Sequence, residues 1–242
     1  MKTMLLNGSP KRKFSVSSNL LKFLFLLKGE VIYENIRNKL GYEDITKQLN
    51  NIDNLVIAIP LYVDGIPSHF LEFMQYLEKY CTDHNLHFNV YVISNGGFIE
   101  GKQSRVLFSI FKNFCNRAGL VWNGGIGIGG GVMINVLFIM LKVYFSIFIL
   151  NCIVNGIKTG CWLPINALLD FAKYLAIWLF INIGVLFYEI RIAQSINQKK
   201  YFGEKYTRAM IPTFLFIIIA DIFFIITGLF HGKTVFSLIK NK

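Results

Sequence analysis

Short apolar runs alternate with amphipathic stretches throughout residues 1–131. Residues 54–60 and 88–94 are apolar at successive positions, which is typical of strands buried on both faces of a sheet. Residues 68–80 instead repeat large apolar side chains at the spacing of a helix. The pattern predicts strands at 3–6, 30–36, 54–60, 88–94 and 120–131, and helices at 19–27, 42–53, 68–80 and 103–118. Such alternation predicts an α/β fold with a doubly wound five-stranded parallel sheet, whose β-to-α loops share one edge.

The pattern changes after residue 131, where long apolar runs replace the short ones. Segments 132–154, 167–188 and 211–230 contain few charged residues, and about 20 apolar residues are enough to cross a bilayer. We therefore expect an α/β domain at 1–131 and a hydrophobic, mostly α-helical region at 132–242 that enters a membrane. The alternative is an enlarged helix layer of a soluble fold, used as an oligomer interface.

Composition narrows the classes of partner. The chain has 242 residues, 54% of them hydrophobic, and a formal net charge of +11. The basic residues are scattered among apolar runs and form no stripe or nucleic-acid-binding motif, which argues against a nucleic-acid partner. The charge suits anionic lipid or an anionic cofactor better.

The cysteines do not indicate a metal site. The chain has four, Cys81, Cys115, Cys152 and Cys161, and no pair has the C-x-x-C spacing of zinc or iron–sulfur sites. We expect free thiols and no metal.

The loop at residues 7–19 has the composition of an anion cradle. Gly8 permits a sharp turn, and serine hydroxyls then precede a helix for which Ser17 or Ser18 is the expected N-cap. The N-terminus of a helix carries a partial positive charge and unpaired N–H groups, both of which favour a phosphate. The loop matches neither G-x-G-x-x-G nor the Walker motif, so a single terminal phosphate fits better than a pyrophosphate. The alternative is a solvated loop with an ordinary cap.

Two further loops complete a constellation that suits flavin mononucleotide. Residues 60–67 read PLYVDGIP, in which two prolines stiffen the chain and Tyr62 can cover a flat ring. Residues 94–101 read SNGGFIEG, in which paired glycines allow the backbone close to a ligand. In a doubly wound sheet all three loops meet at the carboxyl edge, where ligands bind.

These blocks, together with FKNFCNRAGLVWNGGIGIGGG, make residues 1–131 resemble the flavodoxin-like NAD(P)H-dependent FMN reductase family. The resemblance implies a flavodoxin-like fold, bound FMN, NAD(P)H as co-substrate and, as in many such reductases, a homodimer. It assigns the phosphate to Ser9, Lys11, Ser17, Ser18 and Asn19. It assigns the flavin ring to Pro60, Leu61, Tyr62, Val63, Asn95, Gly96, Gly97 and Phe98. Phe14 and Val16 depart from the usually more polar loop.

The function expected from the sequence is an FMN-dependent NAD(P)H oxidoreductase at a membrane, with residues 1–131 in the cytoplasm and a small acceptor such as a quinone or a flavin. No catalytic side chain is assigned, because the hydride chemistry belongs to the flavin. His69, Asp64 and Glu100 are better interpreted as core or solvated residues. A non-enzymatic, membrane-anchored flavin electron carrier or redox sensor is the alternative, and a small permease is a third.

Overall fold

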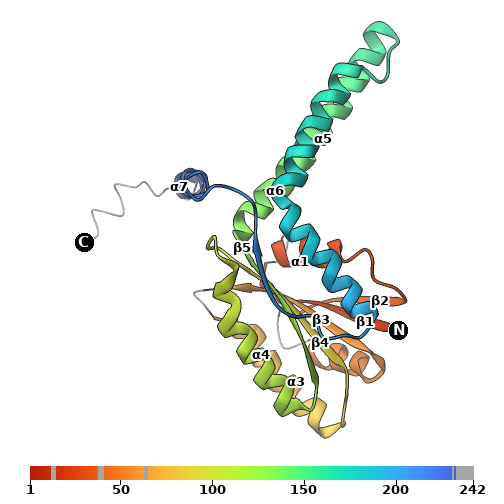
Figure 1. The fold of residues 1–242 in the computed structure, drawn as a ribbon, viewed down its shortest axis with the longest axis vertical. Coiled ribbons are helices and arrows are strands. Elements are labelled where there is room, and N and C mark those ends of the chain that lie inside the picture. Colours follow the sequence, from red (N-terminus) through yellow and green to blue (C-terminus); the bar gives the residue numbers. More distant parts are fainter. Residues whose placement is uncertain (12–14, 38–40, 63–64, 231, 233–242) are drawn as a thin grey trace, which may run out of the picture. The chain divides into compact units, whose positions relative to one another are not determined.

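Six parallel strands form a sheet in the order β2-β1-β3-β4-β5-β6 (Figure 1). The computed structural model describes all residues except 12–14, 38–40, 63–64, 231 and 233–242. The strands are β1 (Lys2–Asn7), β2 (Glu30–Asn35), β3 (Asn54–Leu61), β4 (Asn89–Gly96), β5 (Val121–Gly129) and β6 (Gly203–Arg208). The order of the first five strands is that of the flavodoxin-like doubly wound fold, which confirms the predicted fold class. The prediction of five strands was wrong by one: β6 extends the sheet beyond β5.

Helices cover both faces of the sheet. They are α1 (Val16–Phe23), α2 (Tyr42–Gln48), α3 (Ser68–Asp83), α4 (Arg105–Ala118), α5 (Gly131–Thr159), α6 (Ile165–Asn197) and α7 (Thr213–Phe230), with short 3-10 turns η2 (Leu49–Asn51) and η3 (Gly101–Ser104). Helices α2, α3 and α4 enclose the larger apolar core, to which the sheet contributes residues such as Ile57 and Val92. The C-terminal part of α6 lies on the opposite face, where the Asn54 amide and the Tyr91 hydroxyl donate to backbone carbonyls of Ile196 and Ser195.

An antiparallel helical hairpin connects β5 to β6. Helix α5 leaves the sheet at the end of β5, α6 returns, and β6 then pairs in parallel with β5 (Figure 1). The chain forms two units by internal contacts, Met1–Ala209 and Met210–Lys242, and the hairpin belongs to the first. The second contains α7, whose described side chains are exposed or half-buried.

Three of the helices in the described part of the chain, α5, α6 and α7, are long and apolar enough to cross a membrane. They correspond in position to the predicted segments 132–154, 167–188 and 211–230. The polar stretch at 189–210 contains the end of α6 and all of β6.

Candidate flavin site

The predicted phosphate loop, residues 7–19, begins where β1 ends, at the carboxyl edge of the sheet. The Gly8 N–H donates to the Ala58 carbonyl at 2.8 Å, which extends the pairing of β1 with β3 into the loop. The Ser9 N–H donates to Asn7 Oδ1 at 3.1 Å, and the Lys11 N–H to Ser9 Oγ at 3.4 Å. The loop therefore turns back on itself, with Ser9 buried and Lys11 exposed.

Ser15 caps helix α1, not Ser17 or Ser18. The Ser15 side chain accepts a hydrogen bond from the Ser18 N–H at 3.0 Å, and Ser15 has the extended backbone of an N-cap residue. Ser17 and Ser18 consequently lie in the first turn of the helix, where N–H groups lack partners within the helix. The sequence could have shown this cap, because serine precedes Ser18 by three residues, the spacing of a cap and the N–H it accepts.

One amide joins the loops of three strands. Asn95, at the end of β4, donates through Nδ2 to Ser17 Oγ at 2.9 Å and to the Ile59 carbonyl of β3 at 3.3 Å. All three residues are buried. The bond to Ser17 connects the end of β4 to the phosphate loop that follows β1, and the bond to Ile59 connects it to β3. The tips of β1, β3 and β4 therefore converge, as the sequence predicts.

The two predicted ring loops, 60–67 and 94–101, begin side by side. Pro60 pairs with Asn95 and Leu61 with Gly96 in the register of β3 and β4. A side chain added at Gly97 would meet no atom within 4 Å, so this position faces open space.

Two aromatic side chains of these loops are partly exposed. Tyr62 is 43% exposed and Phe98 is 58% exposed, and a partly exposed aromatic side chain can cover a flat ring. Tyr62 is held by paired backbone hydrogen bonds with Gly65 at 3.1 Å and 2.9 Å. Val63, also predicted to contact the ring, lies outside the described residues.

The remaining predicted residues surround the start of α1. Ser18 Oγ accepts a hydrogen bond from the Tyr33 hydroxyl at 2.8 Å, and Asn19 is half-buried.

His69 lies at the start of α3. Burial lowers the pKa of its imidazole, while hydrogen bonds with the backbone of Gly8 and Ile36 raise that pKa by less. A neutral imidazole at pH 7 adds no positive charge to the phosphate loop.

The start of α5 contacts the loop at 94–101, and the sequence did not reveal this contact. The Gly130 N–H donates to the Phe98 carbonyl. A Cβ atom at Gly131 would lie 3.0 Å from the Gly96 carbonyl oxygen and 3.2 Å from Asn95 Oδ1, closer than most side chains come to a neighbour. Glycine therefore allows α5 to begin directly against the end of β4.

The donor set fits FMN. Serine hydroxyls, the N–H groups at the first turn of α1 and the Lys11 ammonium suit a phosphate dianion. The open space at Gly97 and the partly exposed aromatic side chains of Tyr62 and Phe98 suit a flat aromatic ring. Among the described residues, no cluster of histidine, cysteine or acidic side chains could hold a metal ion.

Two cavities are lined by residues outside the candidate flavin site. One, of about 610 Å³, is lined by Tyr42, Glu43, Glu72, Gln75 and Tyr76. The other, of about 530 Å³, is lined by Lys102, Arg105, Glu204 and Tyr206. Neither contains a residue of the candidate flavin site.

Comparison with known proteins gives similarity of fold only. No protein-family model and no curated protein matches the chain. Among solved structures, the NADPH-quinone reductase from P. pentosaceus is 15% identical, with a TM-score of 0.47 over 54% of this chain and 86% of that one. The Trp repressor binding protein from Bacillus subtilis is 19% identical, with a TM-score of 0.44 over 53% of this chain and 84% of that one. The WrbA-like flavodoxin from Agrobacterium tumefaciens is 15% identical, with a TM-score of 0.41 over 50% of this chain and 75% of that one. At such values the likeness does not bear on function, and the flavodoxin-like fold follows from the strand order of the chain itself.

Proposed function

We propose that the chain is an FMN-dependent NAD(P)H oxidoreductase, associated with a membrane, that passes electrons to a small acceptor such as a quinone or a flavin. The observation that carries the proposal is the Asn95 amide, which joins the phosphate loop to the two ring loops through Ser17 and Ile59. A doubly wound sheet binds its ligand where such loops meet.

Different residues at this edge would bind the phosphate and the ring of the cofactor. Ser9, Ser17, Ser18 and Asn19 would hold the phosphate, and Lys11 would balance its charge. Pro60, Leu61 and Tyr62 after β3, and Asn95, Gly96, Gly97 and Phe98 after β4, would contact the ring.

The chemistry that FMN supplies when bound is acceptance of a hydride, two electrons and one proton, from NAD(P)H and delivery of the electrons to an acceptor. The contribution of the protein is to fix the ring, to exclude water and to leave one face open. No side chain at this edge needs to act as an acid or a base, because the hydride chemistry belongs to the flavin.

The apolar helices support the membrane part of the proposal. Exposed large apolar residues are concentrated on α5, α6 and α7, and a water-soluble surface rarely carries so many together. NAD(P)H is a cytoplasmic reductant, so we place residues 1–131 on the cytoplasmic side. Arg191, Lys199, Lys200, Lys205 and Arg208 belong to the same contact unit and agree with the positive-inside rule. The homodimer implied by the resemblance stays a prediction.

Steady-state turnover tests the function. The protein purified in detergent and supplied with FMN should oxidise NAD(P)H when a quinone or free flavin is present. The Ser18→Asp variant should lose most of this activity at low FMN concentration, because a carboxylate in the first turn of α1 repels phosphate. It should still fold, since acidic residues are favourable in that turn. Ser109→Asp, on the exposed side of α4, is the matched control and should behave like the wild type.

Two results would contradict the proposal, the first for the activity and the second for the phosphate site. Bound FMN that is reduced only by a partner protein, with negligible NAD(P)H oxidation, would indicate the electron carrier. Equal activity of Ser18→Asp and Ser109→Asp would show that the phosphate does not bind at α1.

A further inference from the structure

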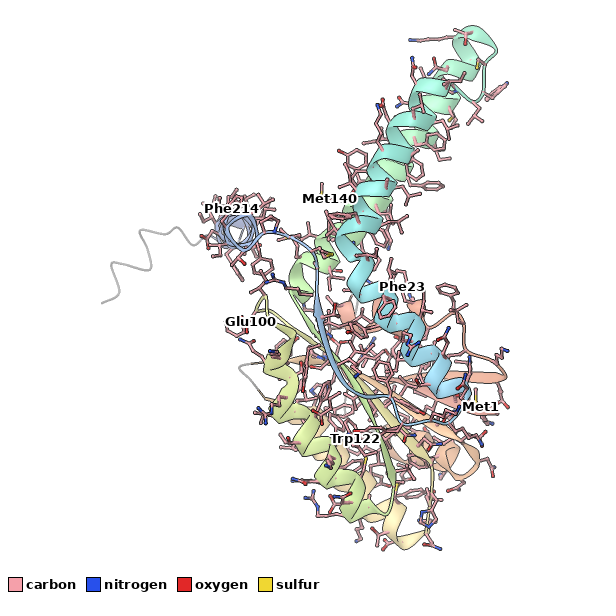
Figure 2. All side chains as sticks on the ribbon, in the orientation of Figure 1. Met1, Phe23, Glu100, Trp122, Met140 and Phe214 are labelled. Atoms are coloured by element: carbon pink, nitrogen blue, oxygen red, sulfur yellow. The ribbon has the colours of Figure 1, made fainter. Side chains whose placement is uncertain are left out.

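The carboxyl edge of the sheet and the base of the α5–α6 hairpin are one region of the molecule. Helix α5 begins two residues after β5 ends, and its first residue, Gly131, abuts the ring loop at Asn95 and Gly96. Figure 2 shows Glu100 on the side of the sheet from which the hairpin rises and Trp122, near the start of β5, on the far side. A membrane or partner that surrounds the hairpin therefore lies close to the predicted ring loops at 60–67 and 94–101.

The hairpin has the length of a bilayer's hydrocarbon layer. Its two helices pair from Leu137, whose carbonyl accepts from the Trp178 indole at 3.0 Å, to the tip, where Trp162 packs on Gly156. The rings of Tyr144 and Tyr174, 3.7 Å apart, fix the register between these points. At 1.5 Å per residue, α5 rises about 33 Å from Leu137 to Thr159, and a hydrocarbon layer is about 30 Å thick.

The surface of the hairpin favours lipid over a protein partner. Apolar side chains are exposed on both helices and along their whole length, whereas a single protein partner would bury one face and leave the others polar. The exposed side chains include Ile139, Val143, Phe145, Ile149, Leu150, Ile153, Ile165, Leu169, Ile177 and Phe180. Lys158 and Trp162 lie at the tip, a pair typical of the far membrane interface.

The charges within the hairpin are compatible with insertion. Asp170 and Lys173 form an ion pair at 3.4 Å, so together they bring no net charge into the membrane. Lys142 lies about 8 Å along α5 from Leu137, near enough to the interface for a long side chain to reach it.

Exposed cations lie at the same edge as the ring loops. Lys11 follows β1, Lys102 follows β4, and Arg208 is the last residue of β6. All three strands end at this edge because the sheet is parallel. Basic side chains placed near the base of an inserted hairpin suit the anionic headgroups of a cytoplasmic leaflet.

We propose that the hairpin seats the carboxyl edge of the sheet against an anionic bilayer, so that the loops at 60–67 and 94–101 open toward the membrane surface. The proposal rests on the proposed function for the identity of these loops as a flavin site. The orientation itself follows from the hairpin and needs no flavin.

Fluorescent labels at opposite edges of the sheet test the orientation. Cys152 and Cys161 are replaced by serine; Cys81 and Cys115 stay, because burial raises the pKa of each thiol to about 12 and prevents labelling in the folded protein. An environment-sensitive fluorophore is then attached to a single new cysteine. The carboxyl-edge variants are Phe98→Cys and Tyr62→Cys, and the matched control is His84→Cys, exposed at the end of α3.

Each labelled full-length protein is placed in vesicles of equal parts phosphatidylcholine and phosphatidylglycerol that contain a nitroxide-headgroup lipid. The expected result is quenching at positions 98 and 62 several times stronger than at position 84. Equal quenching at the two edges would overturn the proposal. A second result would also overturn it: labels at 98 and 62 that neither aqueous iodide nor the nitroxide lipid quenches. Such labels would indicate that a second copy of the chain, and not lipid, covers the edge. Circular dichroism of each variant confirms the fold.

The test separates this proposal from the function. A protein that binds no FMN but shows the edge-dependent quenching would refute the flavin site and keep the orientation. A protein that binds FMN but shows equal quenching at both edges would keep the flavin site and refute the orientation.

Discussion

Asn95 is the residue on which the geometry of the candidate site depends most. Its amide is buried and makes two hydrogen bonds, to Ser17 Oγ and to the Ile59 carbonyl, each in a different loop or strand. The sequence places Asn95 correctly, because an apolar strand ending in Asn-Gly-Gly predicts a polar tip. It could not give the partners, since Ser17 is 78 residues away in the chain.

Asn95→Ala should lower both stability and flavin affinity. The substitution leaves a buried hydroxyl and a buried carbonyl without their donor, which costs about 1–3 kcal/mol. Thermal unfolding in detergent, with and without FMN, measures both effects. Ser109→Ala, which removes only an exposed bond to the Arg105 carbonyl, is the control and should change the free energy of unfolding by less than about 0.5 kcal/mol. An unchanged unfolding temperature in Asn95→Ala would contradict the assigned role.

Glu189 is a buried carboxyl group that the sequence did not mark. It lies in the part of α6 that covers the sheet, among buried residues such as Val185 and Ile192. Among the described residues, neither carboxyl oxygen has a hydrogen-bond partner.

Glu189→Met should therefore stabilise the fold, by about 1–3 kcal/mol, because it removes an unpaired polar group from an apolar site. Thermal unfolding checks this. Glu43→Met, at an exposed position of α2, is the control for a general effect of added methionine. A destabilised Glu189→Met protein would mean that the carboxyl group has a partner.

At the scale of elements, β5 was predicted from the sequence and β6 was not. The predicted strand at 120–131 corresponds to β5, Val121–Gly129, although its second half is rich in glycine. Ile126 and Ile128 are fully buried and alternate with glycines, which satisfies the period of a strand. The strand β6, GEKYTR, has no apolar run and lies at the sheet edge, so no local pattern separates it from a loop.

Gly127 of β5 is required by the close approach of η3. A Cβ atom at Gly127 would lie 2.5 Å from the Gly101 carbonyl oxygen and 2.9 Å from Ser104 Cβ. Gly127→Ala should cost about 1–3 kcal/mol through overpacking. Gly97→Ala, which meets open space, should change stability by less than about 0.5 kcal/mol. Chemical unfolding of both variants tests the contrast, and equal stability would contradict this packing.

Asp53 connects the returning hairpin to the start of the sheet. The Lys199 ammonium, hydrogen-bonded to it at 2.6 Å, and the Lys2 N–H lower the pKa of its carboxyl group. Because the pKa of Asp53 is lower in the folded state, its ionised carboxylate stabilises the fold. This stabilisation is complete above the pKa of an unfolded aspartate, about 4, and is lost as the pH falls through the pKa of the folded state.

Asp53→Asn should therefore lower the free energy of unfolding at neutral pH by no more than about 1 kcal/mol, because the pair is partly exposed. The difference from the wild type should shrink between about pH 5 and pH 2. Unfolding curves across this range check the prediction. A difference that does not change with pH would assign the effect to something other than ionisation.

At the scale of the whole molecule, the α5–α6 hairpin belongs to the same unit as the sheet, Met1–Ala209. The sequence correctly predicts a flavodoxin-like sheet and the approximate positions of the long apolar helices. It cannot show that α5 and α6 form a crossover that returns to the sheet, because that depends on pairing between β5 and β6 across 73 intervening residues. If the carboxyl edge faces lipid, an acceptor dissolved in the membrane reaches the ring loops directly.

Equilibrium binding of FMN to the full-length protein in detergent is the most direct test of the account. The converging loops of β1, β3 and β4 predict one FMN per chain, with the visible absorption bands of a protein-bound flavin. Riboflavin, which lacks the phosphate, should bind more weakly by at least about tenfold, because charge-assisted hydrogen bonds at α1 are lost. A colourless protein that takes up no added FMN, or one that binds riboflavin equally well, would contradict the central claim.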